Sequence, residues 1–280
     1  MKHILSVDVE EWFHPEAVHH LFPNENWQEL DERVTHNVLR LLDLFEKREV
    51  TATFFILGWI ARQHPELVKR IAEAGHEIAS HGNQHRMLTK MNKDEFREDL
   101  KTSKDILQDV IGQQVIGFRA PTFSLVKETR WAWSVMVDLG FRYDSSVYPI
   151  WHDRYGIPDA PRFAYTAFQK NGQSLIEFPM PTLRILGKNI PFGGGGYLRL
   201  LPLPFTKMAI RRFHSLRQPS IIYVHPWEFD DDQPRLNLGA VQKWRHYHNI
   251  DKNLARLGRL LQNYQWVSFK DFLDSGQLKP

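Results

Sequence analysis

Short apolar runs alternate with amphipathic stretches along most of this chain. The first run spans 4–9, and Val34, Val38, Leu41, Leu42 and Phe45 then follow helical spacing. The β-branched and aromatic run 51–57 predicts a strand, and Pro65 and Gly75 are typical start and stop residues of the next helix. The same alternation predicts strands at 77–79, 115–118, 141–144, 175–178, 220–224 and 266–268, and helices at 93–110, 128–139, 205–216 and 250–263.

Strands that alternate this regularly with helices indicate a parallel sheet covered by helices. We expect an α/β fold in which residues 1–280 form a single-domain distorted (β/α) barrel of about seven parallel strands. A doubly wound open sheet is the alternative. The segments 146–174 and 186–204 interrupt the pattern and are expected to be ordered loops over the site. Residues 226–280 are expected to form an extension packed on the barrel.

Composition narrows the function classes. Thirty-six Lys and Arg against thirty-three Asp and Glu leave a net charge of +3, which argues against a nucleic-acid partner. The chain has no cysteine, so disulfides, thiolate zinc sites and cysteine nucleophiles are excluded. The longest apolar run, 54–61, is too short for a transmembrane segment, and Asp8 interrupts the run that a signal peptide would continue. We therefore expect a cytoplasmic protein.

Two pairs of candidate ligands follow the first and third predicted strands. Asp8 and Glu10 share one face of an extended strand, so one could bind a cation while the other handles protons. His81 and His85 follow the strand 77–79, and a single turn would direct both imidazoles toward one point, as a metal requires. The alternatives are a solvated acidic turn and two surface histidines, and fourteen histidines make the spacing common by chance.

Three further candidates lie at the ends of later strands. Arg119 could clamp a carboxylate, His225 ends a nearly all-apolar strand, and Asp144 could orient His225 by accepting its other N–H. A surface ion pair and a core or capping histidine are the structural alternatives. Active sites of parallel barrels gather at the carboxyl ends of the strands, so together the five positions predict a site at that face.

The blocks 51–58, 75–81 and 118–121 resemble those of the polysaccharide deacetylase superfamily, the NodB-homology domain of carbohydrate esterase family 4. The resemblance extends from Ser6 to His225. Segments 194–199 and 225–229 are similar to a bacterial branch found with exopolysaccharide synthesis and exosortase-type export loci. The resemblance implies a hydrolase that removes N-acetyl groups from N-acetylhexosamine residues of a polysaccharide or its lipid-linked precursor and releases acetate.

The resemblance also implies residue roles. Glu10, His81 and His85 would bind Zn²⁺ or another divalent transition metal. Asp8 would be the base, Arg119 would hold it ionised, and His225, with Asp144, would serve as the acid. Substrate contacts are expected from Trp12, Pro121, Tyr148, Tyr197 and Trp227.

This chain departs from the family pattern at three places. Asp8-Val9-Glu10 replaces two adjacent aspartates, Thr122 separates Pro121 from Phe123, and no Trp follows Asp144 at the usual distance. Two other functions therefore remain open: hydrolysis of a small cyclic or linear amide, and carbohydrate binding without turnover. The sequence does not indicate which glycan is used or the oligomeric state.

Overall fold

The computed structural model describes residues 1–278. Its strands are β1 (Lys2–Val9), β2 (Thr53–Ile56), β3 (Glu77–Ser80), β4 (Gly117–Phe118), β5 (Tyr143–Asp144), β6 (Tyr165–Lys170), β7 (Gln173–Glu177), β8 (Thr182–Ile185), β9 (Lys188–Pro191), β10 (Ile221–Val224) and β11 (Gln265–Val267). Its α-helices are α1 (Glu16–His19), α2 (Val34–Lys47), α3 (Gly58–Gln63), α4 (Pro65–Glu73), α5 (Lys93–Ile111), α6 (Ala132–Asp138), α7 (Gly195–Leu200), α8 (Leu203–Ser215), α9 (Ala240–Tyr247), α10 (Ile250–Leu261) and α11 (Phe269–Asp274).

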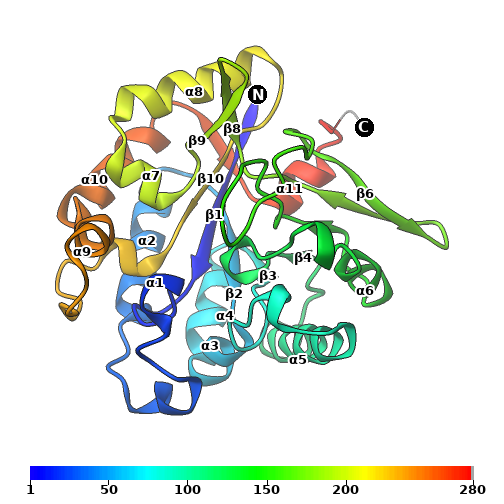
Figure 1. Ribbon diagram of the computed structural model, residues 1–280, viewed down its shortest axis with the longest axis horizontal. Coiled ribbons are helices and arrows are strands. Elements are labelled where there is room, and N and C mark those ends of the chain that lie inside the picture. The colour runs from blue at the N-terminus through cyan, green and yellow to red at the C-terminus, as the bar shows by residue number, and fades with distance from the viewer. Residues whose placement is uncertain (279–280) are drawn as a thin grey trace.

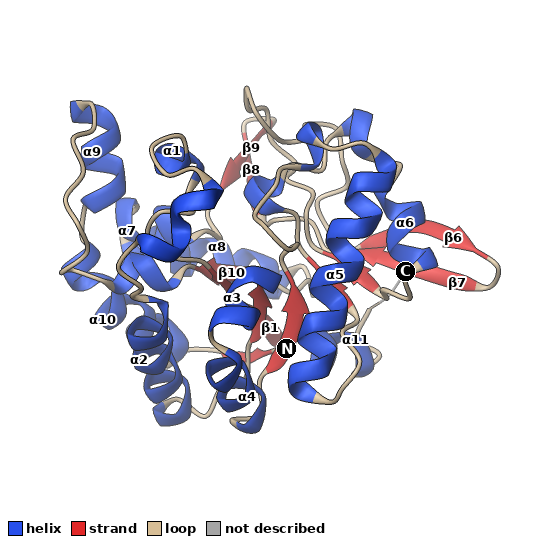
Figure 2. Ribbon diagram, turned by 90° about the horizontal axis from the view of Figure 1, so that it is seen from below, coloured by secondary structure: helices blue, strands red, loops and turns tan. Residues whose placement is uncertain are grey.

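One sheet organises the molecule. Its strand order is β10-β1-β2-β3-β4-β5-β7-β6, and β11 also pairs with β1. The seven strands from β10 to β7 are parallel, whereas β6 is antiparallel to β7 and projects with it from one end of the sheet (Figure 1). The helices surround the strands (Figure 2). The predicted α/β fold with a mainly parallel, distorted barrel is therefore confirmed.

The side chains of β1 alternate between two apolar clusters. Leu5, Val7 and Val9 belong to the large cluster that also contains the helices' buried residues, whereas Ile4 belongs to the cluster inside the barrel. Phe269, at the start of α11, fills that interior and stacks on Tyr143 with ring centroids 5.2 Å apart. The carboxyl ends of the strands are thus left for polar side chains.

The structure differs from the sequence expectation mainly in the interrupting segments. The segment 146–174 contains β6, and 186–204 contains β9 and α7 rather than loops alone. Helices α3 and α9 were not predicted, because α3 is short and α9 has one buried residue, His246. Among residues 1–278, none of the helices combines the length and the apolar character that a membrane crossing requires.

Candidate active site

The end of β1 supplies two inward carboxylates, as the strand alternation predicts. Asp8 and Glu10 are both buried on the inner side. Glu11 points the other way, and its Oε1 accepts hydrogen bonds from the backbone N–H groups of Arg33 and Val34, each at 2.8 Å, at the start of α2. Burial raises the pKa of Glu11 to about 7. Glu11 is therefore a structural helix cap, separate from the inner pair.

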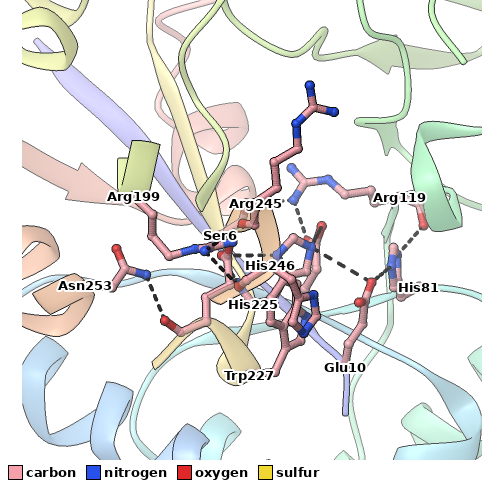
Figure 3. A network of polar contacts seen from close by, with 12 residues as sticks. Ser6, Glu10, His81, Arg119, Arg199, His225, Trp227, Arg245, His246 and Asn253 are labelled. Atoms are coloured by element: carbon pink, nitrogen blue, oxygen red, sulfur yellow. Dashed lines mark hydrogen bonds and ion pairs between the residues drawn. The ribbon is translucent and has the colours of Figure 1, made fainter. Parts of the chain in front are cut away.

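The loop after β3 brings both histidines to Glu10. Gly82 (φ +80°) and His85 (φ 53°) adopt left-handed backbone conformations that bend the chain back on itself. The N–H groups of Gly58 and Trp59, at the start of α3, hold this loop by its carbonyl oxygens. As a result, Oε1 of Glu10 lies 3.2 Å from His81 Nε2 (Figure 3). The same oxygen lies 3.0 Å from His85 Nε2.

The donor set of Glu10, His81 and His85 fits a divalent metal. All three residues are buried, and their ligand atoms lie within 4.8 Å of one another. His81 Nδ1 is 2.8 Å from the carbonyl oxygen of Arg119, which can only accept, so Nδ1 carries the proton. In the neutral imidazole, Nε2 then directs a lone pair at a carboxylate oxygen, and two such acceptors need a cation or a proton between them.

The charge on Glu10 also favours cation binding. Burial works against its ionisation, but the electrostatic influence of His85 and His225 and the side-chain contacts with His81 and His85 outweigh it. They hold the pKa of Glu10 well below its usual range. Glu10 is therefore an anion at neutral pH, and one carboxylate with two imidazoles is a common catalytic zinc set.

Arg119 fixes Asp8 beside this group. Its Nη1 donates to Asp8 Oδ1 at 2.6 Å and to Ser6 Oγ at 2.9 Å, and its Nε donates to the carbonyl oxygen of Ser145 at 3.2 Å. The guanidinium group is fully buried and lies over the ring of Phe55. Arg119 therefore cannot swing away, and the second oxygen of Asp8 is left free of it.

His225 faces the same carboxylates from β10. Its Nε2 is 3.9 Å from Asp8 Oδ2 and 4.0 Å from Glu10 Oε1. Its Nδ1 is 3.2 Å from Glu228 Oε2, which also accepts the backbone N–H of His225. Burial opposes protonation, but Glu10, Glu228 and Asp8 together raise the pKa of His225 to about 9. Glu228 therefore positions the imidazole of His225. The three carboxylates of Glu10, Glu228 and Asp8 together favour its protonated form.

The predicted contact between Asp144 and His225 is wrong. The buried carboxylate of Asp144 accepts the indole N–H of Trp133 at 3.0 Å and a hydrogen bond from the Ser146 hydroxyl. Ser146 Oγ in turn accepts the backbone N–H of Ala120 at 2.8 Å. Asp144 thus supports the loop that carries Arg119, and Glu228 occupies the orienting position that the sequence analysis gave to Asp144.

The predicted sugar-stacking residues separate into two groups. Trp12 and Tyr148 are buried in aromatic packing, and the indole N–H of Trp12 is bound by the carbonyl oxygen of Asp31. Pro121 is also buried, in the turn after Arg119. Tyr197 is half-buried, and the Trp227 ring is stacked between the rings of His225 and His246. Contacts of all five residues with a glycan stay predictions.

Sequence reasoning missed Glu228, although a signal for it was present. Pro226 follows His225, and Glu228 stands three residues after it, which is the spacing of a helix capping box. The short 3₁₀ helix Pro226–Phe229 forms on this cap. Ser6 and Ser145 were also missed, because no local pattern distinguishes a serine that binds a buried arginine.

Known proteins match the two halves of the chain separately. Residues 27–143 match the family "Polysaccharide deacetylase", and residues 145–274 match DUF3473, a domain of unknown function. A peptidoglycan-N-acetylglucosamine deacetylase of Bacillus cereus is 36% identical over 94 residues, 33% of this chain and 34% of that protein. A peptidoglycan deacetylase of Helicobacter pylori is 32% identical over 108 residues, 39% of this chain and 36% of that protein. The chain thus matches about a third of the length of these curated relatives.

A solved structure is similar over the whole chain. A candidate polysaccharide deacetylase from Mycobacterium smegmatis gives a TM-score of 0.62 at 20% identity, covering 100% of this chain and 93% of that one. At this identity the likeness concerns the fold alone. By sequence, residues 27–143 are thus similar to the polysaccharide deacetylase family and residues 145–274 to DUF3473.

Proposed function

We propose that this protein is a metal-dependent N-deacetylase that cleaves the acetamido group of an N-acetylhexosamine residue in a glycan and releases acetate. One observation carries the proposal. A three-residue metal set, a carboxylate held off that set by an arginine, and a charged histidine all meet at the carboxyl ends of the parallel strands. Names of relatives that act on peptidoglycan N-acetylglucosamine support the substrate class.

Glu10, His81 and His85 would hold the cation, with Zn²⁺ the best match to two imidazoles and one carboxylate. Such an ion supplies Lewis acidity for the acetamido carbonyl and lowers the pKa of water from about 16 toward 7. Glu10 is one methylene longer than aspartate, which lets the site lie farther from the end of β1.

Asp8 takes the proton from the attacking water in this proposal. Arg119 donates to its Oδ1, so that oxygen is occupied and Oδ2 remains for the water. The fixed guanidinium also holds the Asp8 carboxylate in place beside the proposed ligand set.

His225 donates the proton that the departing sugar amine requires. An amine leaves poorly as an anion, and His225 is a charged imidazole whose Nε2 lies 3.9 Å from Asp8 Oδ2. The oxyanion that develops at the carbonyl would be met by the backbone N–H of Thr122, in the turn after Arg119. Thr122 stands at the departure from the family motif and has a left-handed backbone (φ 57°).

Acetate release from N-acetylglucosamine oligomers, measured with added Zn²⁺, tests the proposal. We expect turnover by the wild type, and loss of both bound metal and turnover in Glu10→Ala and His81→Ala. Metal content is read by elemental mass spectrometry, and Asp159→Asn, an exposed carboxylate paired with Lys127, is the control. Full metal occupancy in a Glu10→Ala/His81→Ala double variant would contradict the ligand set. Turnover of small amides alone would favour an amidohydrolase, and no turnover would favour a glycan-binding protein.

Asp8→Asn separates the base from the ligands. We expect the variant to keep its metal and to lose about 10²- to 10⁴-fold in kcat, because a positioned base typically contributes that much. The same metal and acetate assays read both quantities. An active Asp8→Asn would place the base elsewhere.

We further propose that residues 1–280 act as one domain serving exopolysaccharide synthesis. The single-domain part is supported by the sheet, in which β10 and β11 from the DUF3473 half pair with β1. The biological role rests on the similarity of segments 194–199 and 225–229 noted above.

A further inference from the structure

A groove of about 640 Å³ adjoins the candidate active site. It lies between the N-terminal segment around α1 and helix α9. Trp227 lines it and stacks on His225, with ring centroids 5.4 Å apart. His19 also lines it, and its ring centroid is 6.4 Å from that of the metal-ligand candidate His85. A molecule in this groove would therefore lie one side chain away from the candidate metal ligand His85 and from His225.

The groove is cationic. Three arginines line it. Arg199 pairs with Glu228 at 3.3 Å and Arg154 lies 3.6 Å from Glu16, so Arg245 supplies the excess positive charge. His246 adds no charge, because burial lowers its pKa to about 4. Arg245 is exposed, and no dashed line reaches its guanidinium group among the residues drawn in Figure 3. The groove therefore holds a guanidinium with free donors for an anion.

A buried network fixes Arg245 relative to the catalytic groups. Nη1 of Arg199 donates to the backbone carbonyl oxygens of Arg245, His246 and His248 at 3.0 to 3.2 Å. Nε of the same Arg199 donates to Glu228 Oε1 at 3.3 Å, and Glu228 orients His225. The side chain of Arg199 thus connects the end of α9 to Glu228, and through Glu228 to the proposed acid His225. A guanidinium presented from a fixed backbone suits bidentate binding of carboxylate or phosphate.

We propose that this groove binds a negatively charged group of the glycan substrate, a sugar carboxylate or a phosphate ester, close to the acetamido group that is cleaved. Arg245 provides the main contact, and Arg154 faces the same ligand. The inference rests on the proposed deacetylase function and adds the substrate class: an anionic rather than a neutral N-acetylated glycan.

Three probes test the inference with the Zn²⁺-loaded enzyme. They are a neutral N-acetylglucosamine tetramer, a hyaluronan tetrasaccharide with alternating glucuronate carboxylates, and UDP-N-acetylglucosamine with its diphosphate. We expect a higher kcat/KM for one anionic probe than for the neutral tetramer, and the preferred probe identifies the source of the charge. Arg245→Gln should lower that preference about tenfold through KM rather than kcat. Lys243→Gln, on the same helix but outside the groove lining, should retain it.

Binding separates failure of this inference from failure of the proposed function. Calorimetry with Asp8→Asn measures binding of each probe without turnover. We expect the preferred anionic probe to bind more tightly than the neutral tetramer, and the ratio of the two affinities to fall with added salt. Turnover of the tetramer with equal or better efficiency than both anionic probes would overturn the inference and leave the deacetylase function standing. If Asp8→Asn binds the anionic probes selectively but the wild type releases no acetate from any probe, the proposed deacetylase function alone would be overturned. An unchanged preference in Arg245→Gln would remove Arg245 from the site.

Discussion

At the scale of single residues, the choice of carboxylate beside His225 shows how the site is assembled. Asp144 ends a strand, as a partner of His225 was expected to do, but it binds Trp133 and Ser146. Glu228 reaches His225 from the next helical turn of the same segment. Arg199 balances the charge of Glu228. Burial acts against ionisation of Glu228, but His225 and Arg199 outweigh it and lower the pKa of Glu228.

Glu228→Gln tests this positioning role. Without the carboxylate charge, the imidazolium of His225 is less favoured, so its pKa should fall and the alkaline limb of the kcat profile should move to lower pH. We expect about 10- to 100-fold loss on amide substrates, with less loss on an activated aryl ester, whose leaving group needs no proton. His225→Ala should show the same selectivity more strongly. Equal losses on amide and ester in both variants would contradict the acid role of His225.

At the scale of elements, the glycine-rich segment 193–196 has a packing function that its sequence hides. The carbonyl oxygen of Gly193 accepts the N–H of Tyr223 at 2.9 Å, so the segment extends the sheet beyond β10. Helix α7 begins at Gly195, and a Cβ there would lie 1.7 Å from Glu228 Oε2. Gly195 is therefore required by the close approach of the backbone to the residue that orients His225.

Gly195→Ala and Gly196→Ala form a matched pair. We expect Gly195→Ala to displace the Glu228 carboxylate, to cost about 1–3 kcal/mol of stability, and to reduce amide hydrolysis as Glu228→Gln does. A Cβ at Gly196 would meet no atom within 4 Å, so Gly196→Ala should stabilise the first turn of α7 by about 0.5–1 kcal/mol. Denaturant unfolding and acetate release measure the two effects. Similar behaviour of the two variants would contradict the packing explanation.

At the scale of the whole molecule, β1 joins the two halves of the chain. It pairs with β2 on one side, and with β10 and β11 from the C-terminal half. At its start, the buried His3 accepts the backbone N–H of Ser220 at 3.1 Å, and its ring contacts Trp266. Burial, followed by the nearby His214, lowers the pKa of His3 to about 4. The contact between β1 and the C-terminal half therefore includes the neutral imidazole of His3.

Acid should weaken this junction. The unfolded chain takes up a proton on His3 near pH 6.5 and the folded protein only near pH 4, so the contribution is intact above pH 6.5 and is lost as the pH falls. We expect His3→Gln to flatten the fall in unfolding free energy between pH 7 and pH 4 by at most about 3 kcal/mol. Urea unfolding across that range measures it, and the exposed His36→Gln is the control. An unchanged slope in His3→Gln would show that His3 does not titrate on unfolding.

Local patterns determined the alternating strands and helices, the inward direction of Asp8 and Glu10, and the strand-end positions of His81, Arg119 and His225. These follow from side-chain periods of two and 3.6 residues, which a few neighbours set. Only the tertiary structure decided that Glu228 rather than Asp144 meets His225, and that Trp12 and Tyr148 are buried. Those outcomes depend on distances between segments far apart in sequence, and packing of the whole chain fixes such distances.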